Sequence, residues 1–246
     1  MKRIITVVTS LVLIICCLIL ITHKKKFKIE NKKKETIMTY ESDYFEIKYE
    51  AQNEELLHNI TEPINENLLR IMNFFEIDKL DRKIQIKIYP TLESWKNFIN
   101  SIGEYQDYIV GCVVRGTIHV LAYDEYKKTN NHRNDTIEDF QKIIIHECVH
   151  FCHNQIFTGL YSEPFFVFEG IATYLADQNY NTQINIDYPK ETLFDSSKFM
   201  QMTNDPYSAS QKIIRKLIEN VSHEQLLNYA KNPQNLYDDW EKIGMK

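Results

Sequence analysis

Apolar and polar residues alternate with a period of two in several segments of the first half of the chain. Residues 44–49 and 83–89 alternate strictly, which is typical of strands with one buried face. Residues 109–114 and 117–122 flank Arg115-Gly116 and are predicted to form a hairpin. All predicted strands precede residue 123.

Apolar residues at helical spacing predict the remaining elements, most of them in the second half. The predicted helices are 53–75 with Pro63 inside it as a break or kink, 91–99, one from a cap at Asp135 or Thr136 to about His153, one from Ser162 and Pro164 to near Asp177, 207–220, and 222–230. Residues 124–134 and 181–200 are predicted to be irregular. Strands that come first and helices that follow favour an α+β fold over a parallel sheet.

Composition and net charge do not identify the class of protein, but they reduce the number of classes to consider. Of 246 residues, 43% are hydrophobic and 26% are charged, which suffices for one domain with a sizeable core. The net charge of −5 gives no case for binding nucleic acid.

The amino-terminal residues are predicted to lie outside this domain. Residues 4–21 carry no charge and would span about 27 Å as a helix, close to the hydrocarbon core of a bilayer. A cleaved signal peptide or a lipidated Cys16 or Cys17 are the rival interpretations, but large residues stand where small ones are expected. We therefore expect an uncleaved anchor at 4–21, a lysine-rich stalk at 22–40 and a globular domain at 41–246.

Two patterns disagree about the side of the membrane on which the domain lies. Lys2 and Arg3 precede the apolar run, whereas seven lysines follow it, so the positive-inside rule favours a cytoplasmic domain. A short basic start before an apolar run is typical of secretory signals. We expect a single-pass protein of the cell membrane with an external domain.

The sequence His146-Glu147-Cys148-Val149-His150 is the strongest candidate for a chemical site. On a helix the two histidines lie about 40° apart and can bind one metal ion. Glu147 lies about 60° from His150, which suits a general base rather than a ligand. Cys148 falls on the opposite face, and Cys112, Cys148 and Cys152 are expected to be small buried hydrophobic residues.

A catalytic zinc site needs a third protein ligand and one open position. Metzincins place a histidine six residues after the second, where this chain has Ile156, so that class is excluded. Glu169 follows His150 after residues 151–168, within F-V-F-E-G-I-A-T-Y. This spacing and segment resemble the gluzincin (peptidase MA-like) metallopeptidases and their W-L-x-E-G-x-A-x-Y segment.

The resemblance implies a thermolysin-like zincin domain that holds Zn²⁺. Such a domain has a small antiparallel sheet packed on the zinc helix and a helical carboxyl-terminal lobe. It implies that His146, His150 and Glu169 bind the metal, and that Glu147 is the general base of peptide-bond hydrolysis. The expected substrate is a peptide or protein, extended along an edge strand within residues 112–121.

The resemblance extends to a few supporting positions. Gly170 and Ala172 match small residues that let the second helix approach the first, and Thr173 matches a position that supports a histidine ligand. Tyr207, in D-P-Y-S-A-S, matches a tyrosine that stabilises the oxyanion, although Ala209-Ser210 replaces the family's K-G pair. The glycine-acid-asparagine motif of the aminopeptidases is absent, which favours an endopeptidase.

Two other classes of protein fit parts of the pattern. A membrane-anchored pseudoprotease would keep the metal and act by binding a partner, but the intact Glu147 argues against it. An intramembrane protease would place the motif in an apolar helix, whereas Glu138, Asp139 and Lys142 precede it here. His153 also faces the metal side, and we expect it to support the site or line its rim.

Overall fold

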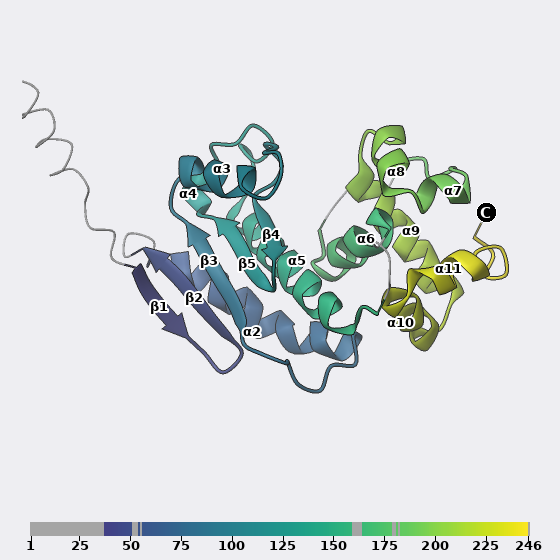
Figure 1. Cartoon of the computed structure of the whole chain (residues 1–246), viewed down its shortest axis with the longest axis horizontal. Coiled ribbons are helices and arrows are strands. Elements are labelled where there is room, and N and C mark those ends of the chain that lie inside the picture. The colour runs from purple at the N-terminus through teal and green to yellow at the C-terminus, as the bar shows by residue number, and fades with distance from the viewer. Residues whose placement is uncertain are drawn as a thin grey trace, which may run out of the picture. The chain divides into compact units, whose positions relative to one another are not determined.

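The computed structural model describes residues 37–50, 54, 56–158, 164–178, 181 and 183–245 (Figure 1). The strands are β1 (Ile37–Glu41), β2 (Phe45–Glu50), β3 (Ile84–Tyr89), β4 (Gly111–Val114) and β5 (Thr117–Leu121). The helices are α2 (Leu57–Phe74), α3 (Leu92–Asn100), α4 (Tyr123–Tyr126), α5 (Ile137–Ile156), α6 (Phe165–Leu175), α7 (Lys190–Leu193), α8 (Ser196–Met202), α9 (Pro206–Asn220), α10 (His223–Lys231) and α11 (Pro233–Asp239). This content confirms the α+β class.

The five strands form one mixed sheet in the order β1-β2-β3-β5-β4. The β2–β3 and β3–β5 pairs are parallel, and the β4–β5 hairpin is antiparallel. The prediction of an antiparallel sheet is therefore wrong for the β2–β3 and β3–β5 pairs. Because α2 connects β2 to β3, the chain crosses over and returns in the same direction.

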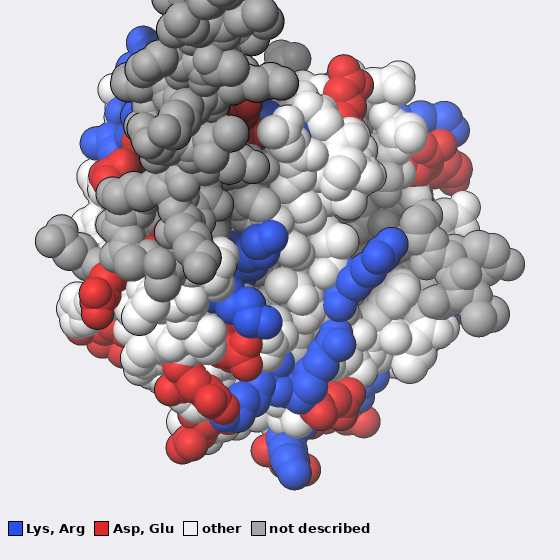
Figure 2. Space-filling view, turned by 60° about the vertical axis from the view of Figure 1, so that its left-hand side comes forward, with Lys and Arg blue, Asp and Glu red and all other residues white. Residues whose placement is uncertain are grey.

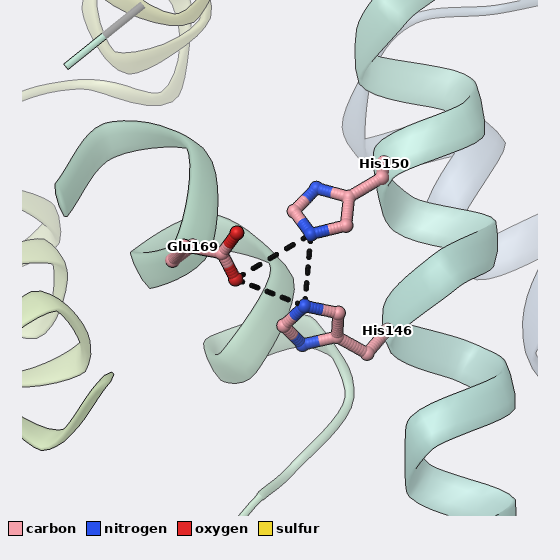
Figure 3. Close-up of side chains that lie close together, drawn as sticks. All are labelled: His146, His150 and Glu169. Carbon is pink, nitrogen blue, oxygen red and sulfur yellow. Dashed lines mark hydrogen bonds and ion pairs between the residues drawn. The ribbon is translucent and has the colours of Figure 1, made fainter. Parts of the chain in front are cut away.

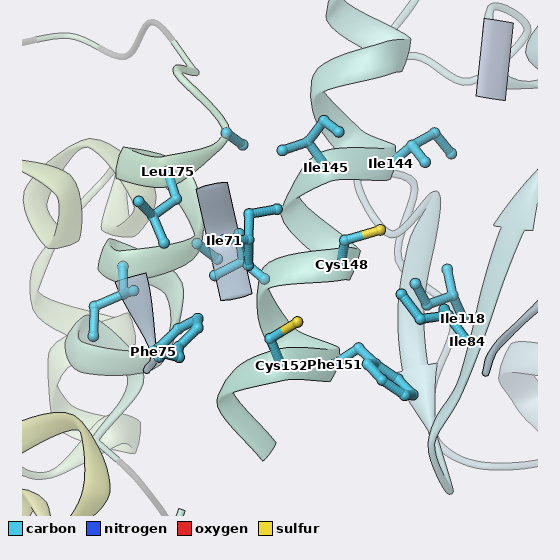
Figure 4. Close-up of a cluster of buried hydrophobic side chains, with 14 of the residues drawn as sticks. Ile71, Phe75, Ile84, Ile118, Ile144, Ile145, Cys148, Phe151, Cys152 and Leu175 are labelled. Carbon is cyan, nitrogen blue, oxygen red and sulfur yellow. The ribbon is translucent and has the colours of Figure 1, made fainter. Parts of the chain in front are cut away.

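The inner face of the sheet and the helices α2 and α5 enclose the core. The β2 and β3 strands bury every second residue over most of their length, as their alternation predicted, and α2 continues through Pro63. Figure 4 shows Ile71 and Phe75 from the α2 region, Ile84 and Ile118 from the sheet, and Cys148 and Cys152 from α5 in one apolar cluster. The α5 helix thus lies against the sheet on one side and α2 on the other.

Local sequence chemistry determines where α5 begins. The Thr136 hydroxyl accepts from the Asp139 backbone N–H, and the Asp139 carboxylate accepts from the Thr136 backbone N–H. This reciprocal capping box satisfies two backbone donors that a helix start leaves free. It fixes the start of the helix that carries both histidines.

The glycine after Glu169 determines how closely α9 approaches α6. A Cβ at Gly170 would lie 2.5 Å from Ile214 Cγ1 and 2.6 Å from the Ser210 carbonyl oxygen. The family resemblance predicted that Gly170 allows the histidine-bearing helix to approach closely. The helix that approaches closely at Gly170 is instead α9, because the Cα of Gly170 faces the backbone of Ser210.

Several expectations about the chain outside the core need correction. Residues 37–40, predicted to end the stalk, belong to β1, so regular structure begins before the predicted domain boundary. Short helices α4, α7 and α8 lie in segments that were predicted to be irregular, and α11 was not predicted. These helices have four or seven residues, too few to show a helical period.

The predicted anchor at 4–21 and most of the predicted stalk lie outside the described residues. None of the helices that the structure does describe is long and apolar enough to cross a bilayer.

Candidate metal centre

Two helices bring three potential ligand atoms together (Figure 3). The α5 helix presents His146 and His150, and α6 presents Glu169. Glu169 Oε2 lies 3.1 Å from His146 Nε2 and 3.5 Å from His150 Nε2, and the two Nε2 atoms are 2.8 Å apart. The buried group of two histidines and one glutamate could hold a metal ion.

The geometry of this group fits a zinc-sized cation. Two ligand atoms of a tetrahedral zinc stand about 3.4 Å apart. The two separations from Glu169, 3.1 and 3.5 Å, are close to this value, and the two histidine nitrogens, at 2.8 Å, are closer together. If both rings carry their proton on Nδ1, two imidazole lone pairs face each other at 2.8 Å. A cation among the three atoms would remove that repulsion and balance the Glu169 charge.

Gln178 fixes the orientation of His146. Its Oε1 atom lies 2.9 Å from His146 Nδ1, so the amide oxygen accepts the Nδ1 proton and leaves Nε2 free to bind a metal. Gln211 in turn donates from Nε2 to the Gln178 backbone carbonyl at 2.5 Å. Gln178 was not singled out from the sequence, because 32 residues separate it from His146.

Thr173, which the family resemblance assigned to histidine support, is placed differently. Its hydroxyl donates to the Gly170 carbonyl at 3.1 Å, one turn earlier in its own helix. The side chain that forms a hydrogen bond with a histidine of the group is therefore Gln178 and not Thr173.

Glu147 lies beside the ligand group, against the edge of the sheet. A Cβ at Gly111 would stand 2.9 Å from Glu147 Oε1, so β4 begins directly beside this carboxyl. Glu147 is buried, and its Oε2 atom has no hydrogen-bond partner within the described part of the chain. A buried carboxyl oxygen without a partner is costly in a purely structural role.

Burial and mutual interaction shift the pKa values of all four groups. Burial raises the pKa of Glu147 to about 8; His146 opposes this shift and Glu169 adds to it. Burial lowers the pKa of His150 to about 4, although Glu169 opposes the shift. Burial alone would raise the pKa of Glu169 and lower that of His146. At Glu169, the interactions with His150 and His146 outweigh burial and lower the pKa. At His146, the interaction with Glu169 outweighs burial and raises the pKa. A cation at the ligand group would favour the ionised form of Glu147 by its charge.

The other residues named from the sequence have distinct surroundings. Tyr207 lies in the first turn of α9, half-buried, with its ring edge against Phe165 at 5.5 Å between centroids. His153 is fully buried rather than at a rim, and its Nε2 atom lies 3.0 Å from the Ala230 carbonyl oxygen. Cys148 and Cys152 are buried free thiols on the core side of α5, as expected.

Neither a protein-family model nor a curated protein sequence matches this chain.

Proposed function

We propose that this chain is a zinc-dependent peptidase that hydrolyses peptide bonds with Glu147 as general base. The observation that supports this most strongly is the joint arrangement of the buried ligand group and the unpartnered Glu147 oxygen beside it. A metal site with a purely structural role would close its coordination with protein ligands and needs no such base.

His146, His150 and Glu169 would hold the ion, and Gln178 would keep His146 in the correct tautomer. When bound, Zn²⁺ supplies Lewis acidity, which polarises a carbonyl and makes water easier to deprotonate. Glu147 would accept the proton from the attacking water and deliver it to the leaving amine nitrogen. Because Glu147 is buried beside Gly111, the proton transfer would occur away from bulk solvent.

The edge strand β4 offers a place for the substrate. It is the last strand in the sheet order, so its second edge pairs with no other described strand. An extended peptide could add there by main-chain hydrogen bonds and pass over Glu147. An open edge of this kind supports an endopeptidase, which we propose is held at the cell membrane by residues 4–21.

The test is to separate metal binding from turnover in the full-length protein purified in detergent. We expect about one zinc per chain, and we expect His146→Ala and Glu169→Ala to lose it, by metal analysis after dialysis. Glu147→Gln should keep zinc and fold but lose peptide hydrolysis by several orders of magnitude, because the ligands remain while the base is removed.

Glu138→Gln is the matched control, since this glutamate lies in the first turn of the same helix and, among the described residues, forms an ion pair with Lys142 alone. It should retain full activity. A Glu147→Gln protein as active as the wild type would refute the assigned base. Zinc binding without hydrolysis of any peptide would favour the pseudoprotease instead.

A further inference from the structure

The strand that begins beside Glu147 ends at a cavity. The β4 strand starts at Gly111, beside Glu147, and runs to Val114 before the turn at Arg115 and Gly116. The cavity, of about 620 Å³, lies at the far end of this strand. It is lined by Asp81, Arg82, Val113, Arg115, Gly116, Phe151, Asn154 and Gln155.

The same helix forms one wall of the cavity and carries the candidate base. Phe151 and Asn154 follow Glu147 by one and two turns on nearly the same side of α5. Opposite them, Val113 and Arg115 follow Gly111 along β4. Four residues of strand span about 13 Å, so the cavity lies three to four peptide residues away from Glu147.

Two arginines give the cavity its charge. The guanidinium of Arg82 lies across the turn, because a Cβ at Gly116 would overlap Arg82 Nη2, and this nitrogen donates to the Arg115 carbonyl at 3.4 Å. Neither Arg82 nor Arg115 forms an ion pair with any other described residue, and both are exposed. Asp81 is the one acidic lining residue, so the two arginines leave an excess of positive charge.

One further feature favours an anionic group here. Gln155 accepts from the Asp81 backbone N–H, but its buried Nε2 donor has no partner among the described atoms. Elsewhere basic side chains also gather locally: Figure 2 shows a band of lysine and arginine side chains on one face, although the whole chain has a net charge of −5. At the cavity itself, the two arginines outnumber the one aspartate.

We propose that this cavity is a substrate subsite for an aspartate or glutamate side chain. The proposal rests on the proposed peptidase function, since it assumes that a peptide lies along β4. Arg82 and Arg115 would bind the carboxylate by charge-assisted hydrogen bonds. A peptide that pairs antiparallel with β4 runs from Arg115 towards Gly111. The acidic residue therefore lies three or four residues before the cleaved bond, on its amino-terminal side.

The test uses peptides that carry one glutamate, moved residue by residue along both sides of the cleaved bond, with glutamine peptides as partners. Zinc-loaded full-length protein should cleave the peptide with glutamate three or four residues before the bond about tenfold faster in kcat/KM than its glutamine partner. This preference should shrink at high salt. Arg82→Gln with Arg115→Gln should abolish it, and Arg82→Glu with Arg115→Glu should replace it by a preference for lysine.

Arg133→Gln is the matched control, since Arg133 is exposed, bonds only to Asn130 and does not line the cavity. It should keep the glutamate preference. No preference, a preference on the carboxyl-terminal side, or one that survives removal of both arginines would overturn the subsite.

A peptide-binding experiment distinguishes failure of the subsite from failure of the proposed peptidase function. The Glu147→Gln protein, loaded with zinc, is titrated with fluorescently labelled versions of the same peptides, and Kd is measured. Tighter binding of the glutamate peptide, lost in the double arginine variant, would support the subsite even if the wild type cleaved nothing. Equal binding of the glutamate and glutamine peptides would overturn it independently of activity.

Discussion

The side-chain amide of Gln178 determines which nitrogen of His146 carries a proton. Its oxygen lies 2.9 Å from Nδ1, and its own backbone is held by Gln211. Without this acceptor the His146 ring would lose its fixed tautomer and its fixed orientation. We therefore expect Gln178→Leu to weaken zinc binding about 10- to 100-fold, measured by competition with a chromogenic chelator.

Thr173→Val provides the comparison. It removes a hydroxyl that donates only to the Gly170 carbonyl in the same helix. Its zinc affinity should stay within about twofold of the wild type, since no described bond links Thr173 to a ligand. The reverse result, a weak effect at Gln178 and a strong one at Thr173, would contradict the assigned roles.

Tyr207 is the candidate that depends most on the family resemblance. If its hydroxyl stabilises negative charge on the carbonyl oxygen during attack, Tyr207→Phe should lower kcat by about 10²–10³ with little change in KM. Stability should change little, because the ring that contacts Phe165 is retained. An unchanged kcat would show that Tyr207 serves packing, and steady-state kinetics beside thermal unfolding separates the two results.

The starting residues of two helices could be predicted from the sequence. Thr136 with Asp139, and Ser222 with Gln225, form capping boxes from residues three apart, so the signal is local. The mixed order of the sheet was not predictable in the same way, because β3 pairs with strands that lie before α2 and after α3. The three candidate ligands were predictable because a helical spacing defines the two histidines and a family resemblance of one short segment indicates Glu169, whereas Gln178 carries no local signal.

The contact between α6 and α9 depends on the absence of a side chain at Gly170. Gly170→Ala would force a methyl group to within 2.6 Å of a backbone oxygen, which the rigid helix cannot avoid without moving. We expect a loss of about 1–3 kcal/mol in the free energy of unfolding, as found for overpacked cores. Urea denaturation measures it, and Gly103→Ala, where no atom lies within 4 Å of the added Cβ, is the control.

The stability of the whole protein should depend on the metal. An ion that binds the folded but not the unfolded chain stabilises the fold by about 2.7 kcal/mol when its concentration is 100 times Kd. Scanning calorimetry should therefore show a lower Tm after chelation, restored by added zinc. His146→Ala should show a Tm that zinc does not change; a Tm that rises equally in both proteins would place the stabilising ion elsewhere.

The candidate ligands come from two helices, and metal binding would therefore have a mechanical consequence. An ion held by His150 and Glu169 would close residues 150–169 into a ring, much as a disulfide does. The ion would link α5, which packs against the sheet, to α6, which packs against α9. A chain cut once between residues 158 and 164 would then remain joined through the ion, and removal of zinc would release its two fragments under far milder denaturing conditions.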